Sequence, residues 1–144
     1  MAYHDDIAND KMTELIIGKA IEIHKGVGPG WPEEHYQELL FDELEEAGLD
    51  CQCEHEVPIT YKGKSVGVGY ADLYVEQTVV LELKVVKTTT EAHFQQLGRY
   101  VRALNATRGL LLNFGSSTLI TRRYTNFKAQ AEQAEEAEED DRVA

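Results

Sequence analysis

The segment from Thr78 to Val86, Thr-Val-Val-Leu-Glu-Leu-Lys-Val-Val, constrains the fold of this 144-residue chain more than any other. β-Branched and apolar residues fill most of it, which is typical of a central strand covered on both faces. Glu82 and Lys84 nevertheless lie within this run. Residues two apart in a strand point to the same face, and a charge enters an apolar layer only if it is compensated. We therefore expect both side chains to face a polar site.

A third charged residue fits the same face. Asp72 precedes Glu82 by ten positions, and an antiparallel hairpin with an odd-length loop centred on Gln77 would place the two carboxylates opposite each other. Two faces then follow from this register: one holds Leu73, Val75, Val79, Leu81 and Leu83, and the other holds Asp72, Tyr74, Val80, Glu82 and Lys84. Adjacent carboxylates repel unless a divalent cation lies between them, and oxygen ligands favour Mg²⁺ or Mn²⁺ over zinc. The alternative is a solvated ion cluster at a strand end, which stays open here.

The remaining segments alternate between helical and extended periodicity. Helices are expected over 12–27, from Pro32 to a cap at Gly48, and after a capping box from Thr88 to Glu91. Strands are expected over 51–60 and 64–70 at a sheet edge, joined by a Lys62-Gly63 turn, and over 108–113 and 118–124. The pattern predicts one α/β domain over residues 1–125, followed by an acidic tail over 126–144.

Charge is distributed unevenly along the chain. The net charge is −12, but residues 84–128 carry 8 basic and 1 acidic side chains. Such a basic block favours a polyanionic partner, although arginines in a run also commonly form a merely solvated face. The candidate phosphate contacts are Arg99, Arg102, Arg108, Arg122, Arg123 and Lys128.

The lack of a recognisable membrane helix or signal peptide, together with the cysteine spacing, predicts a cytoplasmic protein. No apolar run approaches the roughly 20 residues of a membrane helix, and the N-terminus lacks the order of a signal peptide. Cys51 and Cys53 are too close in an extended segment for a mutual disulfide, so we expect reduced thiols. An intermolecular metal or redox site at these cysteines is a weaker alternative.

Several short motifs, taken together, resemble a known family. Residues 30–36, Gly-Trp-Pro-Glu-Glu-His-Tyr, fit the Gly-x-x-Glu-x-x-Tyr signature of the GxxExxY proteins, which belong to the PD-(D/E)XK nuclease superfamily. The resemblance covers roughly residues 14 to 124, through Ile23-His24, Gly28-Pro29-Gly30, Pro58 to Tyr61, Asp72, Glu82-Leu83-Lys84, Gln96 with Tyr100, and Gly109 to Gly115. Tyr70 and Pro32 depart from the residues usual at these places.

The resemblance implies a restriction-endonuclease-like core, in which a central mixed β-sheet is flanked by helices. It further implies a metal-dependent nuclease that hydrolyses phosphodiester bonds of DNA, with RNA as the alternative substrate, by a metal-activated water. Its metal set is Asp72, Glu82, Leu83 and Glu33 with Mg²⁺ or Mn²⁺, and Lys84, Gln96 and Tyr100 complete the catalytic set. His93 shares the stripe of Gln96 but is more commonly a surface or capping histidine.

A competing hypothesis keeps the nuclease core but not the activity. The chain would then be a non-catalytic module that binds nucleic acid or protein, because a fold does not guarantee a reaction. The acidic tail would engage a protein partner or the basic block of its own chain, and a homodimer is also open.

Overall fold

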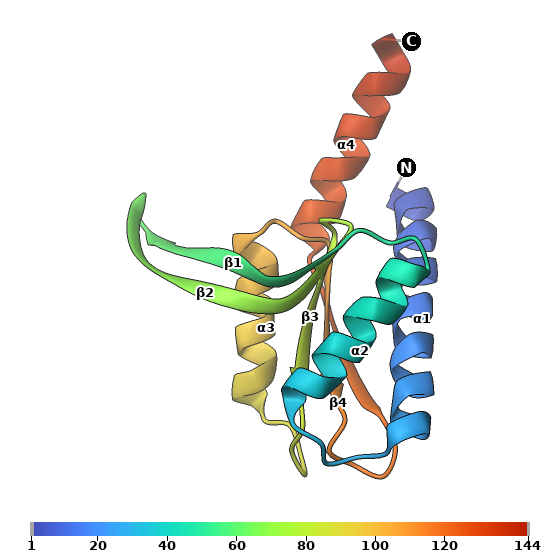
Figure 1. The fold of residues 1–144 in the computed structure, drawn as a ribbon. Coiled ribbons are helices and arrows are strands. Elements are labelled where there is room, and N and C mark those ends of the chain that lie inside the picture. Colours follow the sequence, from blue (N-terminus) through green and yellow to red (C-terminus); the bar gives the residue numbers. More distant parts are fainter. Residues whose placement is uncertain (1, 144) are drawn as a thin grey trace.

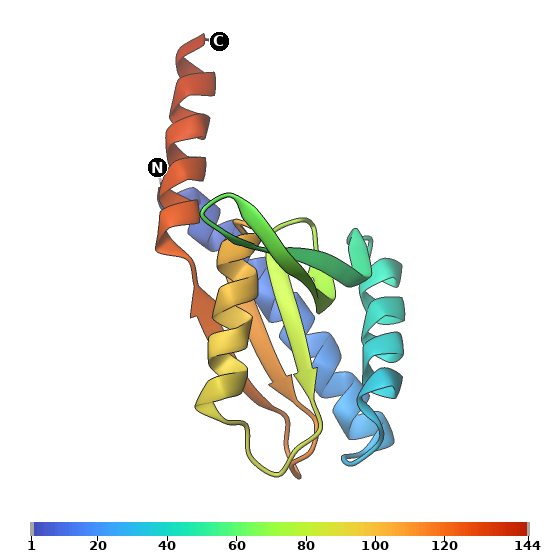
Figure 2. The same cartoon turned by 90° about the vertical axis from the view of Figure 1, so that its left-hand side faces the viewer.

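The computed structural model describes residues 2–143, and the side chains of residues 11–136. Within that range one mixed sheet lies between two helical layers (Figures 1 and 2). Its strands, in their order across the sheet, are β1 (Cys51–Tyr61), β2 (Lys64–Val75), β3 (Val79–Lys84), β4 (Arg108–Asn113) and β5 (Ile120–Thr125). The helices are α1 (Ala2–Val27), α2 (Glu33–Glu46), α3 (Glu91–Ala103) and α4 (Phe127–Val143). The α/β class with a mixed sheet is confirmed.

The strand β3 lies at the centre of the sheet, as its composition predicts. It pairs antiparallel with β2 and parallel with β4, and the other neighbouring pairs are antiparallel. Leu73 pairs with Leu81 and Val75 with Val79, across a turn of residues 76–78. This is the register that the charged residues predict.

Helices cover both faces of the sheet. The helices α1 and α2 pack on one face, whose buried residues include Leu73, Leu81 and Leu83. The helix α3 packs on the other face, where Tyr74 and Val80 lie beside Leu97. The two alternating sets of the predicted hairpin therefore separate as expected, and the charged set lies on the α3 side.

Two helix starts differ from the sequence prediction. The helix α1 begins at Ala2 rather than near Met12, because the periodic stripe marks only the part that packs on the sheet. Pro32 immediately precedes α2 instead of forming its first residue, and its ψ of 146° is extended. Gly48 has a φ of +88°, which suits the helix end predicted there.

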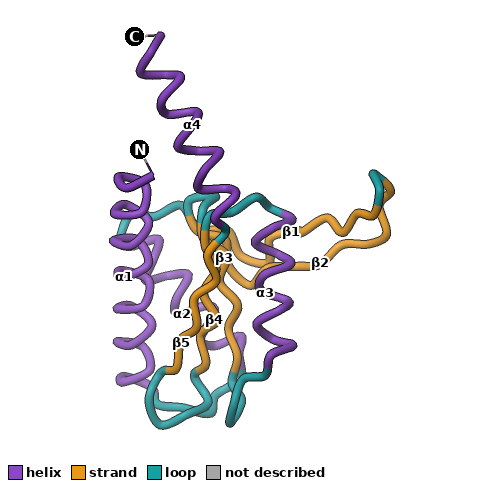
Figure 3. Tube along the Cα trace, turned by 180° about the vertical axis from the view of Figure 1, so that it is seen from behind, coloured by secondary structure: helices purple, strands orange, loops and turns teal. Residues whose placement is uncertain are grey.

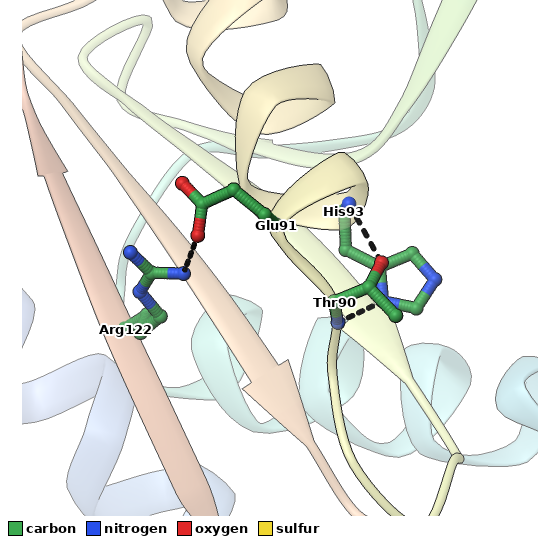
Figure 4. Close-up of polar contacts among 4 residues, drawn as sticks. All are labelled: Thr90, Glu91, His93 and Arg122. Carbon is green, nitrogen blue, oxygen red and sulfur yellow. Dashed lines mark hydrogen bonds and ion pairs between the residues drawn. The ribbon is translucent and has the colours of Figure 1, made fainter.

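The capping box of α3 lies two residues later than predicted. Thr90 is the N-cap, and its hydroxyl accepts a hydrogen bond from the backbone N–H of His93 at 3.3 Å. In return, Nδ1 of His93 accepts one from the N–H of Thr90 at 3.1 Å (Figure 4). The prediction of a Thr88–Glu91 box was wrong because an imidazole nitrogen takes the place usually held by a carboxylate. His93 is thus a capping histidine.

The strands β1 and β2 continue beyond the sheet as a projecting two-stranded ribbon (Figures 1 and 3). We call residues 56–70 the arm; it ends in the predicted turn, where Lys62 and Gly63 have φ values of +50° and +77°. The prediction of edge strands over 51–60 and 64–70 is confirmed, because residues 51–60 pair only with β2 and residues 64–70 only with β1. The strand β2 continues past the predicted end, and its last three residues, Leu73 to Val75, pair with β3 inside the sheet.

The acidic C-terminal segment forms the helix α4, which projects from the body near the N-terminal end of α1 (Figure 1). Its first turns are packed, since Ala129 is fully buried and Gln130 is also buried. Among the described residues, no helix is both long enough and apolar enough to cross a bilayer.

Candidate active site

The candidate site forms where β2 turns away from β3. Ala71 and Tyr74 both pack on the α3 side although they are three positions apart, which a regular pleat would not allow. The strand therefore turns between them, at Asp72. On β1, Glu54 lies opposite Asp72 between two paired residues but is not itself paired, and its φ is +52°. Residues 82–84 of β3 therefore have no paired residue on β2, so the β2 side of this part of the strand is open.

The side chain of Asp72 takes the place of the departing strand. Its Oδ2 accepts a hydrogen bond from the backbone N–H of Leu83 at 2.7 Å. The N–H and C=O of one strand residue point to the same edge, so the Leu83 carbonyl also faces this opening. The Leu83 side chain is fully buried on the other side of the sheet, and only its backbone can serve the site.

Asp72 and Glu82 lie side by side at this opening. The backbone N–H of Asp72 lies 3.4 Å from Oε1 of Glu82, and Glu82 is only 4% exposed. Burial, followed by repulsion from Asp72, raises the pKa of Glu82 to about 8. Burial likewise raises the pKa of Asp72 to about 6, although the hydrogen bond from Leu83 opposes the rise. The pair is therefore short of positive charge.

Lys84 supplies part of that charge from the same face of β3. It is the last residue of the strand and is half-buried, and its charge lowers the pKa of both Asp72 and Glu82. The two carboxylates and the ammonium predicted to share a face are thus brought together. Both pKa values remain raised despite the lysine.

Two further carboxylates act on Asp72 from neighbouring elements. Glu33, the first residue of α2, and Glu54 of β1 both raise its pKa by repulsion. Glu54 was missed by the sequence reasoning. It alternates with Gln52 and Glu56 in the sequence, which reads as an ordinary solvent-facing pattern, and Gln37 holds its carboxylate through a 2.9 Å hydrogen bond.

A second missed residue fixes the backbone that follows Lys84. The amide of Asn113 donates to the carbonyl of Val86 at 2.9 Å and accepts from its N–H at 3.1 Å. Gly115 lies against the same segment, where an added Cβ would be 2.3 Å from the Val86 oxygen. A buried asparagine at the end of an apolar strand was the signal available for this clamp.

Gln96 and Tyr100 lie together on α3, the helix that covers the sheet face of the carboxylate pair. They are one helical turn apart, and the amide of Gln96 donates to the Tyr100 hydroxyl at 3.3 Å. The Tyr100 hydroxyl lies against Gly69 of β2, where a side chain would leave only 2.6 Å between Cβ and the oxygen. The predicted pair is formed, and its tyrosine packs against the arm.

Three of the predicted phosphate contacts lie on the α3 side of the sheet. Arg99 and Arg102 are exposed on α3 itself. Arg122 of β5 lies 3.7 Å above the ring of Phe94, and its guanidinium forms a 3.0 Å ion pair with Glu91 (Figure 4). The exposed guanidinium groups on this side are therefore at the same face as the carboxylate pair.

The other three are dispersed. Arg123 pairs with Leu110 and so faces the α1 side of the sheet, and Lys128 is exposed in the first turn of α4. Arg108 is only 5% exposed and donates to the Thr125 hydroxyl at 3.0 Å. The interior location of Arg108 suits structure and not a contact with phosphate.

The donor set fits a hard divalent cation. Among the side chains of residues 11–136, no three Asp, Glu, His or Cys residues converge to form a ligand set by themselves. Mg²⁺ is ordinarily held by one or two carboxylates, with water and substrate oxygens completing its shell. Asp72, Glu82 and the Leu83 carbonyl match that requirement. Cys51 and Cys53 are free thiols, the first buried and the second exposed.

One comparison with known proteins identifies the family of this chain. A family model described as the PD-(D/E)XK nuclease superfamily matches residues 10–124. A solved chain titled "Crystal structure of SSO0001" aligns over 87% of this chain and 84% of its own length, with 16% identity and a TM-score of 0.44. No curated protein matches the sequence. The family match spans most of the chain and includes every residue of the carboxylate pair and its neighbours, and the chain belongs to the PD-(D/E)XK nuclease superfamily.

Proposed function

We propose that this protein is a metal-dependent nuclease that hydrolyses phosphodiester bonds of DNA, with RNA as a further substrate to be tested. One observation carries the proposal. Asp72 and Glu82 are held side by side at the opening between β2 and β3, and burial leaves both with raised pKa values. Such a pair is stabilised by a cation, and phosphate oxygens readily complete the shell of Mg²⁺ or Mn²⁺.

The residues of the site would have different roles in metal binding and hydrolysis. Asp72, Glu82 and the Leu83 carbonyl would hold the ion, with Glu33 adding negative charge from α2. A bound divalent ion supplies a Lewis acid and a more acidic water at neutral pH. Lys84 lies on the face of the carboxylates, where an ammonium can orient a water and stabilise the charge that develops on phosphate. Gln96 and Tyr100 would position substrate from α3.

The test is hydrolysis of labelled single-stranded DNA, duplex DNA and RNA with Mg²⁺, Mn²⁺ or EDTA. We expect Glu82→Gln and Lys84→Gln each to lower the rate at least ~100-fold, the loss typical of removing one preorganised electrostatic group. The matched controls are Glu14→Gln on α1 and Lys87→Gln, both exposed. Circular dichroism checks that every variant is folded.

Two results would reject the proposal. Hydrolysis that persists in both site variants would identify a contaminant or another site. Binding of nucleic acid by all variants, with no hydrolysis in either metal, would instead favour the non-catalytic module.

A further inference from the structure

The arm and α3 enclose a cleft beside the candidate active site. Its volume is about 450 Å³, which is within the range of sites that hold small organic ligands. Pro58, Ile59 and Thr60 line it from β1, and Arg99, Tyr100 and Arg102 line it from α3. In Figure 2 the arm crosses α3, and in Figure 1 it extends past the helix.

The charge of the cleft is positive in a chain whose net charge is −12. Its charged lining groups are the guanidinium groups of Arg99 and Arg102. Arg102 donates to the Tyr124 hydroxyl at 2.6 Å, and no carboxylate within the side chains of residues 11–136 forms an ion pair with either arginine. Lys62 and Lys64 add positive charge at the tip of the arm. This arrangement favours a polyanion.

The wall opposite the arginines is apolar. Ile59 is 44% exposed, and Pro58 beside it is also exposed. A basic side that follows a phosphate backbone, facing a side that contacts base rings, is the arrangement found in proteins that bind single strands. A volume of this size accommodates one or two nucleotides of one strand and not a paired duplex.

Tyr100 connects the cleft to β2, the strand that carries Asp72. The same side chain lines the cleft, contacts Gly69 of β2 and accepts the hydrogen bond from Gln96. Asp72 lies three residues beyond Gly69 in β2, just past the base of the arm. A strand that follows the cleft would reach the carboxylate pair.

We propose that this cleft binds one single-stranded segment of nucleic acid next to the scissile phosphate. This inference rests on the proposed function for its meaning, but it concerns binding and can be tested without hydrolysis. The phosphates contact Arg99 and Arg102, and a base packs on Pro58 and Ile59.

The test is fluorescence anisotropy of labelled thymidine oligomers of about 12 nucleotides, within the usual site sizes for single strands. The full chain is titrated in EDTA over a range of salt concentrations. We expect Arg99→Gln to weaken binding about tenfold, as for one charge-assisted contact, and to lower the salt slope by about 0.7. Ile59→Glu, which introduces a carboxylate at an exposed position, should weaken binding similarly. Lys25→Gln, an exposed charge on α1, is the matched control.

Four outcomes would overturn the proposal. They are unchanged affinity in both cleft variants, equal losses in Lys25→Gln and Arg99→Gln, tighter binding of duplex than of single strands, and a dimer that Ile59→Glu dissociates without loss of oligonucleotide affinity. The last result, from sedimentation, would assign the cleft to a second copy of the chain. Binding that depends on the cleft residues, without hydrolysis in Mg²⁺, would support the cleft proposal and refute the nuclease proposal. Hydrolysis that Arg99→Gln leaves unchanged would support the nuclease proposal and refute the cleft proposal.

Discussion

The buried carboxyl of Glu82 makes the stability of the metal-free protein depend on pH. Burial and the neighbouring Asp72 raise the pKa of Glu82 from 4.5 to about 8. A tenfold change in proton affinity is worth about 1.4 kcal/mol, so ionising this group costs the folded state on the order of 5 kcal/mol. Glu82→Gln keeps a neutral side chain of the same shape and removes this cost.

The sign follows from the protons bound in each state. Below about pH 4.5 the carboxyl is protonated in both the folded and the unfolded chain, and its full contribution to stability is present. Between pH 4.5 and about 8 the unfolded chain releases the proton while the folded chain retains it, so the free energy of unfolding falls as pH rises. Asp72, whose pKa is raised to about 6, contributes a loss of the same sign at lower pH.

Thermal unfolding in EDTA, measured from pH 5 to pH 9, tests this account. We expect the wild-type Tm to fall by roughly 10 °C across the range, at about 2–4 °C per kcal/mol, and most of that fall to vanish in Glu82→Gln. Mg²⁺ at a hundred times its Kd should restore about 2.7 kcal/mol to the wild type at pH 8, and less to the variant. Glu14→Gln should follow the wild-type curve. Parallel curves for wild type and Glu82→Gln would refute the reasoning.

Two further substitutions test the packing around the site. Gly115→Ala would place a Cβ 2.3 Å from the backbone oxygen of Val86, so we expect the free energy of unfolding in urea to fall by ~2–4 kcal/mol. The control is Gly18→Ala in α1, where no atom lies within 4 Å of the added Cβ. This variant should be neutral or stabilised by up to about 1 kcal/mol. Thr90→Ala removes the hydroxyl that caps the N–H of His93 and should cost ~1 kcal/mol, whereas Thr90→Asp should keep most of the stability. A Gly115→Ala variant as stable as wild type, or equal losses in the two Thr90 variants, would contradict these expectations.

The carboxylate pair could be predicted from sequence because a strand repeats every two residues. That rule, with an odd-length turn, fixes which residues share a face, and it correctly separated Leu81 from Glu82 and placed Asp72 beside it. The class of fold followed from the same alternation between helical and extended periods.

Features that depend on irregular backbone geometry within a strand could not be predicted from the sequence. The turn of β2 at Asp72 and the positive φ of Glu54 leave no mark on an alternating pattern. The same is true of Arg108, because a run of basic residues does not distinguish an arginine inside the sheet from one on its surface. The capping box of α3 was placed wrongly because histidine is an uncommon partner for Thr90.

The hairpin that joins the two carboxylates also bears on the order of folding. Asp72 and Glu82 are ten residues apart, whereas Glu33 and Glu82 are separated by 49. Loop closure costs about 0.6 kcal/mol more for each doubling of length, so the hairpin contact is cheaper to form by roughly 1.4 kcal/mol. Because local contacts are the cheapest to close, we expect the Asp72–Glu82 contact to form in the hairpin before the N-terminal helices pack against it. Divalent cations should then accelerate folding as well as stabilise the product.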